Sequence, residues 1–223
     1  MKISPTLTEV KEIAKTGKYD ILPVSCEILS DFITPIEAMR ILQNVSTHCY
    51  LLESAQANEA WGRYTFLGYD PKLEINCIDG HMKLGKLSVE TENPSEYIRQ
   101  ILSEYKSLKF DYLPSFTGGL VGYFSYDYLG YKEKSIRGKA RDTEDFKDVD
   151  LMLFDKVIAF DNLCQKIILI ANMSLDAPET GYNKAIVELK QLRELLMHGE
   201  KKQNMGGKLL GEVTPLFEKE QYC

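Results

Sequence analysis

The segment from residue 73 to residue 84 constrains the fold of this chain more than any other. Apolar residues alternate with polar ones on both sides of the pair Asp79-Gly80. Alternation with a period of two around an Asp-Gly pair predicts a β-hairpin closed by a two-residue turn. An antiparallel sheet is therefore expected at the centre of the fold.

Further strand patterns recur along the chain. The sequence predicts strands at 49–52, 63–68 and 120–126, and a second hairpin that joins 157–160 to 166–171 through a turn near Asp161-Asn162. A short apolar stretch at 21–24 carries no clear pattern. The strands thus lie mostly in the middle of the chain, between helical segments.

Helix starts are marked by two capping boxes, Thr6–Glu9 and Thr34–Glu37, and the second has Pro35 at its first helical position. Ile36, Met39 and one of Ile41 and Leu42 are expected to face the core from the second helix. Two more helices are expected, one after Asn93 and one near the C-terminus. Because helices flank hairpins without regular strand–helix alternation, the fold class is α+β, a largely antiparallel β-sheet with flanking helices.

One main domain is expected over residues 1–198. Within it, residues 131–150 mix charges of both signs with few apolar groups, which predicts a mobile surface loop. Residues 199–216 are expected to form a linker, since the stretch up to Gly211 is polar and rich in glycine.

Charge and composition exclude several classes of function. Lys and Arg number 27 against 33 Asp and Glu, so the net charge is −6, and no nucleic acid is expected to bind because its backbone needs clustered cations. No apolar run approaches the ~18 residues that span a membrane, and the start lacks a secretory signal, which predicts a cytoplasmic protein. The five cysteines and three histidines are scattered, so no metal site is expected. Without a P-loop, G-x-S-x-G or H-E-x-x-H motif, no catalytic residue is assigned.

Two segments carry candidate binding residues. In Leu51-Leu52-Glu53-Ser54 the carboxylate could neutralise an ammonium group and the hydroxyl could add a hydrogen bond, although a core strand that meets a polar turn gives the same pattern. In Trp61–Gly68, Arg63 could bind a carboxylate through its planar guanidinium group, or lie over an aromatic ring of a half-buried strand. The residues alone leave both alternatives open.

A third segment, Thr117–Asp127, is rich in glycine. It is not a phosphate-binding loop, because it has no Gly-Lys-Ser/Thr and its glycines lie within a strand-like run. The glycines instead indicate a close approach of neighbouring backbones.

Together these three segments, in this order, resemble component I of anthranilate synthase. Thr34-Pro35 at a helix start and Phe160-Asp161 at a strand end add to the resemblance, which spans essentially the whole chain. It implies the N-terminal part of that family's fold, with its feedback site for tryptophan. Glu53 and Ser54, with Leu52, carry over as tryptophan-binding residues, and Arg63 falls near a family position for a basic residue that contacts the ligand.

The resemblance also implies an activity for the complete enzyme. That enzyme is a lyase that converts chorismate and ammonia or glutamine to anthranilate and pyruvate, with Mg²⁺ and a glutamine amidotransferase subunit, component II. The family's catalytic motifs lie in a C-terminal half, and residues 217–223 resemble only the opening of its first helix. The chain alone is therefore expected to be inactive and to hold no cofactor without the missing catalytic half.

Two alternatives remain. The chain could act as a stand-alone amino-acid-binding module, or it could be the N-terminal part of aminodeoxychorismate synthase component I. The Glu53-Ser54 and Trp61–Gly68 segments look more like the anthranilate branch.

Overall fold

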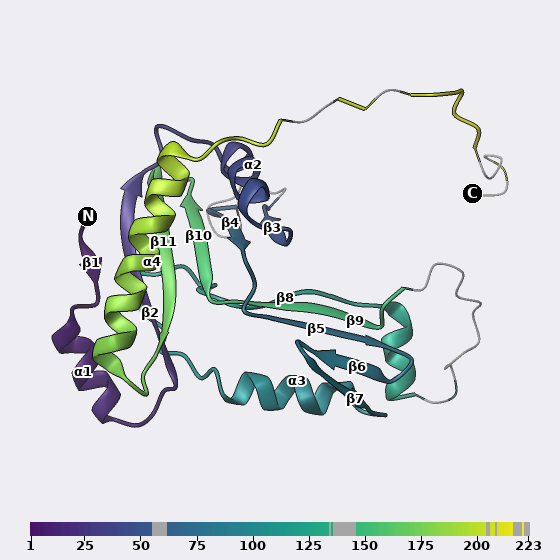
Figure 1. Cartoon of the computed structure of the whole chain (residues 1–223), viewed down its shortest axis with the longest axis horizontal. Coiled ribbons are helices and arrows are strands. Elements are labelled where there is room, and N and C mark those ends of the chain that lie inside the picture. Colours follow the sequence, from purple (N-terminus) through teal and green to yellow (C-terminus); the bar gives the residue numbers. More distant parts are fainter. Residues whose placement is uncertain are drawn as a thin grey trace.

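Two antiparallel sheets of the described residues form the two arms of an L-shaped outline (Figure 1). The computed structural model describes residues 1–54, 62–133, 135, 146–203, 206–207, 209–215 and 220. Within these residues, sheet A has the strand order β1-β2-β11-β10-β4-β3 and sheet B the order β7-β6-β5-β9-β8. The expected α+β class with antiparallel pairing and flanking helices is confirmed, with two sheets in place of the single sheet that the sequence indicated.

The strands of sheet A come from both ends of the chain and its middle. Their bounds, in the order of the sheet, are β1 Ile3–Ser4, β2 Ile21–Leu29, β11 Lys166–Ser174, β10 Lys156–Asp161, β4 Tyr64–Tyr69 and β3 Cys49–Leu52. Those of sheet B are β7 Leu87–Glu90, β6 His81–Leu84, β5 Leu73–Ile78, β9 Val149–Phe154 and β8 Gly119–Phe124.

Helices cover one face of each sheet. The helices α1 (Leu7–Lys15), α2 (Pro35–Val45) and α4 (Pro178–His198) enclose the main core against sheet A. The helix α3 (Pro94–Ser103) packs on sheet B, and the 3-10 helix η1 (Tyr126–Tyr131) lies at the far end of that sheet. None of the helices in the described part of the chain has the length and apolar character needed to cross a membrane.

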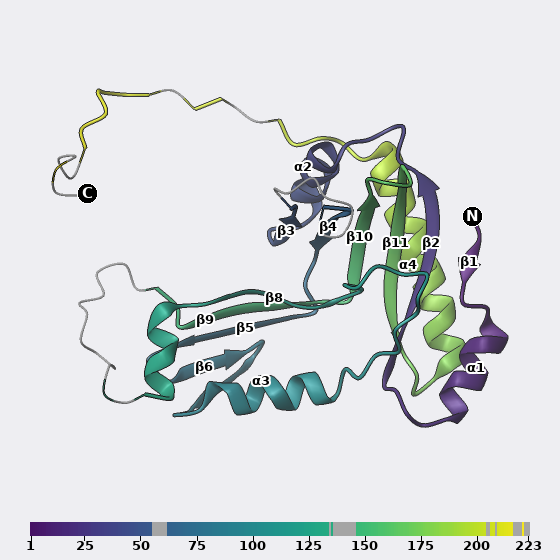
Figure 2. The same cartoon turned by 180° about the vertical axis from the view of Figure 1, so that it is seen from behind.

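The opposite face of sheet A is covered by irregular chain. Residues 104–118 run across β10, β11 and β2 on the side away from α4 (Figure 2). Leu113, with Phe110 and Phe116, packs there against buried residues of the two central strands. As a result β10 and β11 are buried on both faces, which explains why they read as continuous apolar runs.

Local signals place the helix starts and the first hairpin correctly. Both capping boxes are present, with Thr6 and Glu9 in α1 and Thr34 and Glu37 in α2 bonded reciprocally. The β5–β6 turn has positive φ at Asp79 (49°) and Gly80 (85°), as a type I′ turn requires. The hairpin prediction is confirmed. The expected core position of Ile36 is wrong, since the residue is 58% exposed. Ile41 and Leu42, which the sequence offered as core positions, are both buried, together with Ala38.

Two strand assignments needed tertiary information. β2 continues through Pro23, which has no N–H to donate, because β1 pairs only with Ser25 and Cys26 and leaves that edge open at Pro23. The loop expected at 131–150 is too wide, since Tyr131 belongs to η1 and Val149 begins β9. Within it, residues 134 and 136–145 lie outside the described residues.

The glycines of β8 allow the close approach that the sequence indicated. Gly122 lies opposite Leu151 with φ of +151°, and a Cβ there would lie 1.9 Å from the carbonyl oxygen of Asp150. Gly118 has φ of +143°, and its Cβ would lie 2.6 Å from the side-chain nitrogen of Asn172. That same amide of Asn172 donates to the carbonyls of Thr117 (2.6 Å) and Asp155 (3.0 Å), which ties the two sheets together where they meet.

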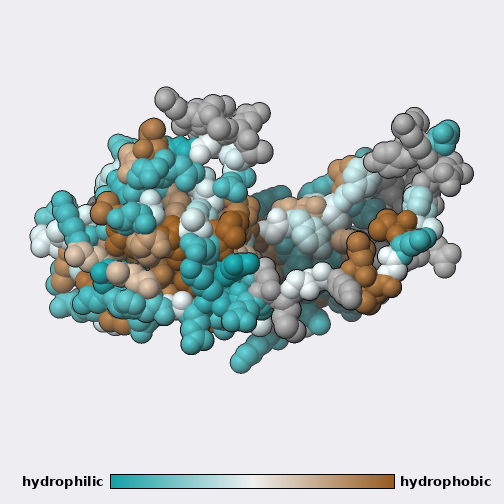
Figure 3. All heavy atoms as spheres, turned by 90° about the horizontal axis from the view of Figure 1, so that it is seen from above, coloured by the Kyte–Doolittle hydropathy of each residue, from teal (hydrophilic) through white to brown (hydrophobic). Residues whose placement is uncertain are grey.

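After α4 the chain leaves the body of the molecule as an extended segment (Figure 1). The amide of Lys202 still donates to the carbonyl of Arg40 over 3.0 Å. Further along, hydrophobic side chains come to the surface on this segment (Figure 3), where Leu209, Leu210 and Val213 are 78%, 98% and 79% exposed. The boundaries expected at 198 and 216 stay predictions, and the helix start expected at 217–223 lies outside the described residues apart from Glu220.

Candidate functional site

The candidate ligand-binding motif lies at the end of an edge strand. β3 is the outermost strand of sheet A, and Leu52, its last residue, is paired with Phe66 of β4. Glu53 and Ser54 follow directly and are exposed. Leu52 itself is 46% exposed, so an apolar side chain, a carboxylate and a hydroxyl stand side by side at an accessible strand end.

Leu52 lies on an aromatic face. Because side chains alternate along a strand, Tyr50 and Leu52 share one side of β3, whereas Cys49 and Leu51 pack on the helix-covered core. Aromatic rings continue on the side of Tyr50: it lies 4.7 Å from Phe154 and 6.3 Å from Phe116, ring centre to ring centre. Two more rings complete an aromatic row that we define as Tyr64, Phe66, Phe116, Tyr50 and Phe154.

Tyr50 is the most tightly held member of this aromatic row. Its side chain is 8% exposed, and its buried hydroxyl has no hydrogen-bond partner among the described residues. Burial raises its pKa, so the phenol is neutral at physiological pH. Gly68 makes the ring's position possible, since a Cβ at Gly68 would lie 2.2 Å from the Tyr50 ring. The packing therefore fixes β3 against β4 just before the candidate motif.

Arg63 is held by a buried carboxylate of its own chain. Its Nε and Nη2 donate to the two carboxylate oxygens of Asp161 over 3.1 and 2.7 Å, and the Asp161 side chain is fully buried. The amides of Leu163 and Cys164 donate to the same carboxylate over 3.2 and 3.0 Å. The Arg63 guanidinium also lies 4.8 Å from the centre of the Tyr64 ring. Two of the five N–H donors of Arg63 are therefore bonded to Asp161 within the chain.

The electrostatics of this pair follow from its contacts. Burial alone would raise the pKa of Asp161, but the hydrogen bonds from Arg63 and from the Cys164 amide outweigh it and hold that pKa below its usual value. The hydrogen bond to Asp161 likewise raises the pKa of Arg63. Both groups are charged at neutral pH, and the pair closes the end of the β4–β10 ladder, where Asp161 lies opposite Tyr64.

The structure brings some of the expected residues together. Leu52, Glu53 and Ser54 are contiguous at the end of β3. Arg63 immediately precedes β4, the strand that pairs antiparallel with β3. Residues 55–61, including Trp61, lie outside the described residues. Sequence reasoning missed Asp161 as the partner of Arg63 and missed the aromatic row. For Asp161 the sequence offered only the Phe160-Asp161 strand end, which pointed to no partner for its carboxylate.

The described residues offer no preformed metal centre. No group of three or more His, Cys, Asp or Glu side chains among them is arranged to hold a metal ion.

Comparison with known proteins identifies the family to which this chain belongs. The family model described as chorismate binding enzyme matches residues 47–223. Anthranilate synthase component 1 of Acetivibrio thermocellus is 31% identical over 98% of this chain and 46% of its own length. The component 1 of Pseudomonas aeruginosa is 35% identical over 84% of this chain and 39% of its own length.

A crystal structure of anthranilate synthase component I from Streptococcus pneumoniae is similar with a TM-score of 0.49 and 25% identity, over 74% of this chain and 36% of the solved one. The chain thus spans less than half the length of the curated relatives it matches. On the family match and the similarity along nearly its whole length, this chain belongs to the chorismate-binding enzyme family and is homologous to anthranilate synthase component I.

Proposed function

We propose that this chain is the N-terminal, tryptophan-sensing part of an anthranilate synthase component I. The observation that carries the proposal is the similarity to the Acetivibrio thermocellus protein over 98% of the chain. The exposed strand end Leu52-Glu53-Ser54, beside an aromatic face, supports it because tryptophan needs an anion for its ammonium group and an apolar surface for its indole ring.

In this proposal each part of the ligand has a partner. The Glu53 carboxylate neutralises the ammonium group, Ser54 adds a neutral hydrogen bond, and Leu52 with Phe66 supplies apolar surface for the ring. Arg63 contributes less than the sequence suggested, because Nε and Nη2 already bind Asp161. The carboxylate of tryptophan would then be held by the remaining Nη1 of Arg63 or by backbone N–H groups.

The activity proposed for the complete enzyme is that of the family. It would convert chorismate and ammonia to anthranilate and pyruvate, with ammonia drawn from glutamine by component II. Because the chain spans less than half the length of the relatives it matches, we place the residues that hold Mg²⁺ in the remainder of the enzyme. We therefore expect residues 1–223 alone to make no anthranilate from chorismate, Mg²⁺ and ammonia.

The test joins residues 1–223 to the catalytic half of a close relative and titrates tryptophan by calorimetry. A hydrogen bond to a charged group contributes ~1.5–3 kcal/mol, so Glu53→Gln should weaken binding roughly ten- to a hundredfold. Ser54→Ala removes a neutral hydrogen bond of ~0.5–1.5 kcal/mol and should matter less. Glu104→Gln, an exposed carboxylate at the end of α3, serves as the control and should change nothing.

Two results would contradict the proposal. The first is a tryptophan affinity and feedback inhibition that survive both Glu53→Gln and Ser54→Ala. The second is anthranilate fluorescence above a no-protein blank from residues 1–223 alone.

A further inference from the structure

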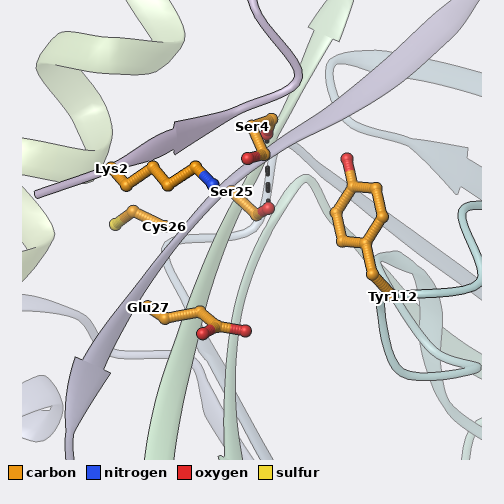
Figure 4. Close-up of a pocket in the computed structure, with 6 residues that line it drawn as sticks. All are labelled: Lys2, Ser4, Ser25, Cys26, Glu27 and Tyr112. Atoms are coloured by element: carbon orange, nitrogen blue, oxygen red, sulfur yellow. Dashed lines mark hydrogen bonds between the residues drawn. The ribbon is translucent and has the colours of Figure 1, made fainter.

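A pocket lies on sheet A, on the face away from α4. Its volume is about 490 Å³, and it is lined by Lys2, Ser4, Ser25, Cys26, Glu27 and Tyr112. In β2, Val24 and Cys26 belong to the helix-covered core, so the alternating Ser25 and Glu27 point to the opposite face. Figure 4 shows Ser25 and Glu27 on one side of this space and the ring of Tyr112 across from them.

The charge of this pocket is opposite to that of the whole chain. Glu27 is paired with Lys166 over 2.6 Å, so these two charges largely cancel. Lys2, which also lines the pocket, has no hydrogen bond or ion pair among the described residues, so its ammonium group is available to a ligand. The N-terminal ammonium group also lies close enough to affect this strand. Burial raises the pKa of Cys26 to about 11, and the positive charge of the N-terminus acts in the opposite direction. In a chain of net charge −6, the pocket is locally positive.

Neutral donors stand beside this cation. The Ser25 side chain is almost fully buried (3% exposed), and its hydroxyl donates to the Ser4 carbonyl over a long 3.3 Å, which leaves it able to turn to a stronger acceptor. Burial, and then the charge of Glu9, raise the pKa of Tyr112 to about 12, so its phenol keeps its proton. The Tyr112 hydroxyl has no partner among the described residues.

The ring of Tyr112 provides a fixed flat wall. It stacks on Phe110 with ring centres 5.0 Å apart and planes 28° from parallel, yet Tyr112 remains 48% exposed. Beyond this ring lies a second cavity of about 300 Å³, whose lining includes the carboxylates of Glu9 and Glu12. Those carboxylates repel an anion, so the space that suits one is confined to the side of Lys2.

We propose that this pocket binds a small aromatic carboxylate, with its carboxylate on Lys2 and Ser25 and its ring against Tyr112. Lys2 supplies the charge, Ser25 the directed hydrogen bond and Tyr112 the stacking surface. The site is separate from the strand end at Glu53, so it goes beyond the proposed function and does not depend on it.

The experiment is a titration of the ¹⁵N-labelled chain with benzoate, followed by amide chemical shifts. We expect the amides of Ser25, Glu27 and Tyr112 to move, with a dissociation constant on the order of 1 mM for so small a ligand. Acetate, which lacks the ring, and benzylammonium, which reverses the charge, should bind at least about fivefold more weakly.

Variants separate the parts of the site. Lys2→Ala should weaken benzoate binding about fivefold, because an exposed ion pair contributes at most ~1 kcal/mol. Tyr112→Leu should weaken it about three- to tenfold by removing the stacking surface, whereas Tyr112→Phe should keep most of it. Lys190→Ala, at an exposed lysine of α4 on the other face of the sheet, is the matched control and should have no effect.

Several outcomes would overturn the proposal. One is that these amides do not shift at a benzoate concentration about ten times the expected dissociation constant, or that the shifts are confined to residues 49–54. Another is that acetate binds as tightly as benzoate. A third is that Lys2→Ala and Lys190→Ala weaken benzoate binding equally. Because Lys2 is exposed, its variant tests the site even if a change at Tyr112 disturbs the fold. Glu53→Gln should leave benzoate binding unchanged, so failure here and failure of the tryptophan proposal can be told apart.

Discussion

Replacing Arg63 by glutamine should destabilise the fold by removing the side-chain cation that is bonded to the buried carboxylate of Asp161. Asp161 accepts four hydrogen bonds, two from Arg63 and two from the amides of Leu163 and Cys164. Removing one partner of a buried ion pair costs ~3–5 kcal/mol. The Arg63 side chain is 36% exposed, and water partly screens the pair, so we expect Arg63→Gln to cost about 2–3 kcal/mol at neutral pH.

The cost should depend on pH in a defined direction. In the natural chain the pKa of Asp161 is lowered, so its stabilising effect is present above the ordinary aspartate pKa and is lost as the pH falls through the lowered value. Without Arg63, burial dominates and raises the pKa of Asp161 in the folded state. The difference in free energy of unfolding between the two proteins should therefore be widest at neutral pH and should narrow as the pH falls toward and below the ordinary aspartate pKa of 3.8.

Urea unfolding followed by circular dichroism, repeated across this pH range, measures the difference. The companion variant Asp161→Asn keeps an oxygen for the two backbone donors, and the double variant leaves no unpaired buried charge. The double variant should therefore be less unstable than the sum of the two single changes. A cost of Arg63→Gln below about 1 kcal/mol that does not change with pH would refute this reasoning.

Two further predictions concern the packing of sheet B. Gly122→Ala should lower the free energy of unfolding by at least about 2 kcal/mol, since its φ is +151° and its Cβ would meet the backbone carbonyl of Asp150. Gly207→Ala, with no atom within 4 Å, should change the free energy of unfolding by less than about 0.5 kcal/mol. Equal effects of the two changes in urea unfolding would exclude the steric explanation. Tyr131→Phe removes a hydroxyl that donates to Asp148 over 2.7 Å and accepts from the backbone amide of Gly80. It should lower the free energy of unfolding by about 1.5–3 kcal/mol in the same assay. An unchanged urea midpoint would show that this hydroxyl does not stabilise the fold.

Elements whose signals are local were predictable from the sequence. The capping boxes at Thr6 and Thr34 and the turn at Asp79-Gly80 each depend on residues within four positions of one another, and all three are present. Gly122 was also interpretable from its local sequence, because a glycine within a strand pattern predicts a close approach of neighbouring backbones.

Elements that depend on distant partners were not predictable in the same way. β9 was partly assigned to a charged loop, because Asp148 and Asp150 precede and interrupt its apolar residues and only pairing with β5 and β8 on both sides makes Val149 the start of a strand. β2 was obscured by Pro23, whose tolerance depends on β1 stopping short of it. A division into two sheets likewise depends on which hairpins pair, and strand patterns do not encode that choice.

Arg63 shows how the same limit applies to the candidate site. The local pattern allowed two interpretations, a residue that binds a ligand's carboxylate or one that lies over an aromatic ring. The structure contains the ring contact, with Tyr64, and it also contains a carboxylate, that of Asp161. The two partners are 98 residues apart and meet only because β4 pairs with β10. The chemistry inferred for Arg63, bidentate binding of a carboxylate, thus takes place within the protein. The proposed tryptophan site at the end of β3 therefore depends chiefly on Glu53 for its charged contact.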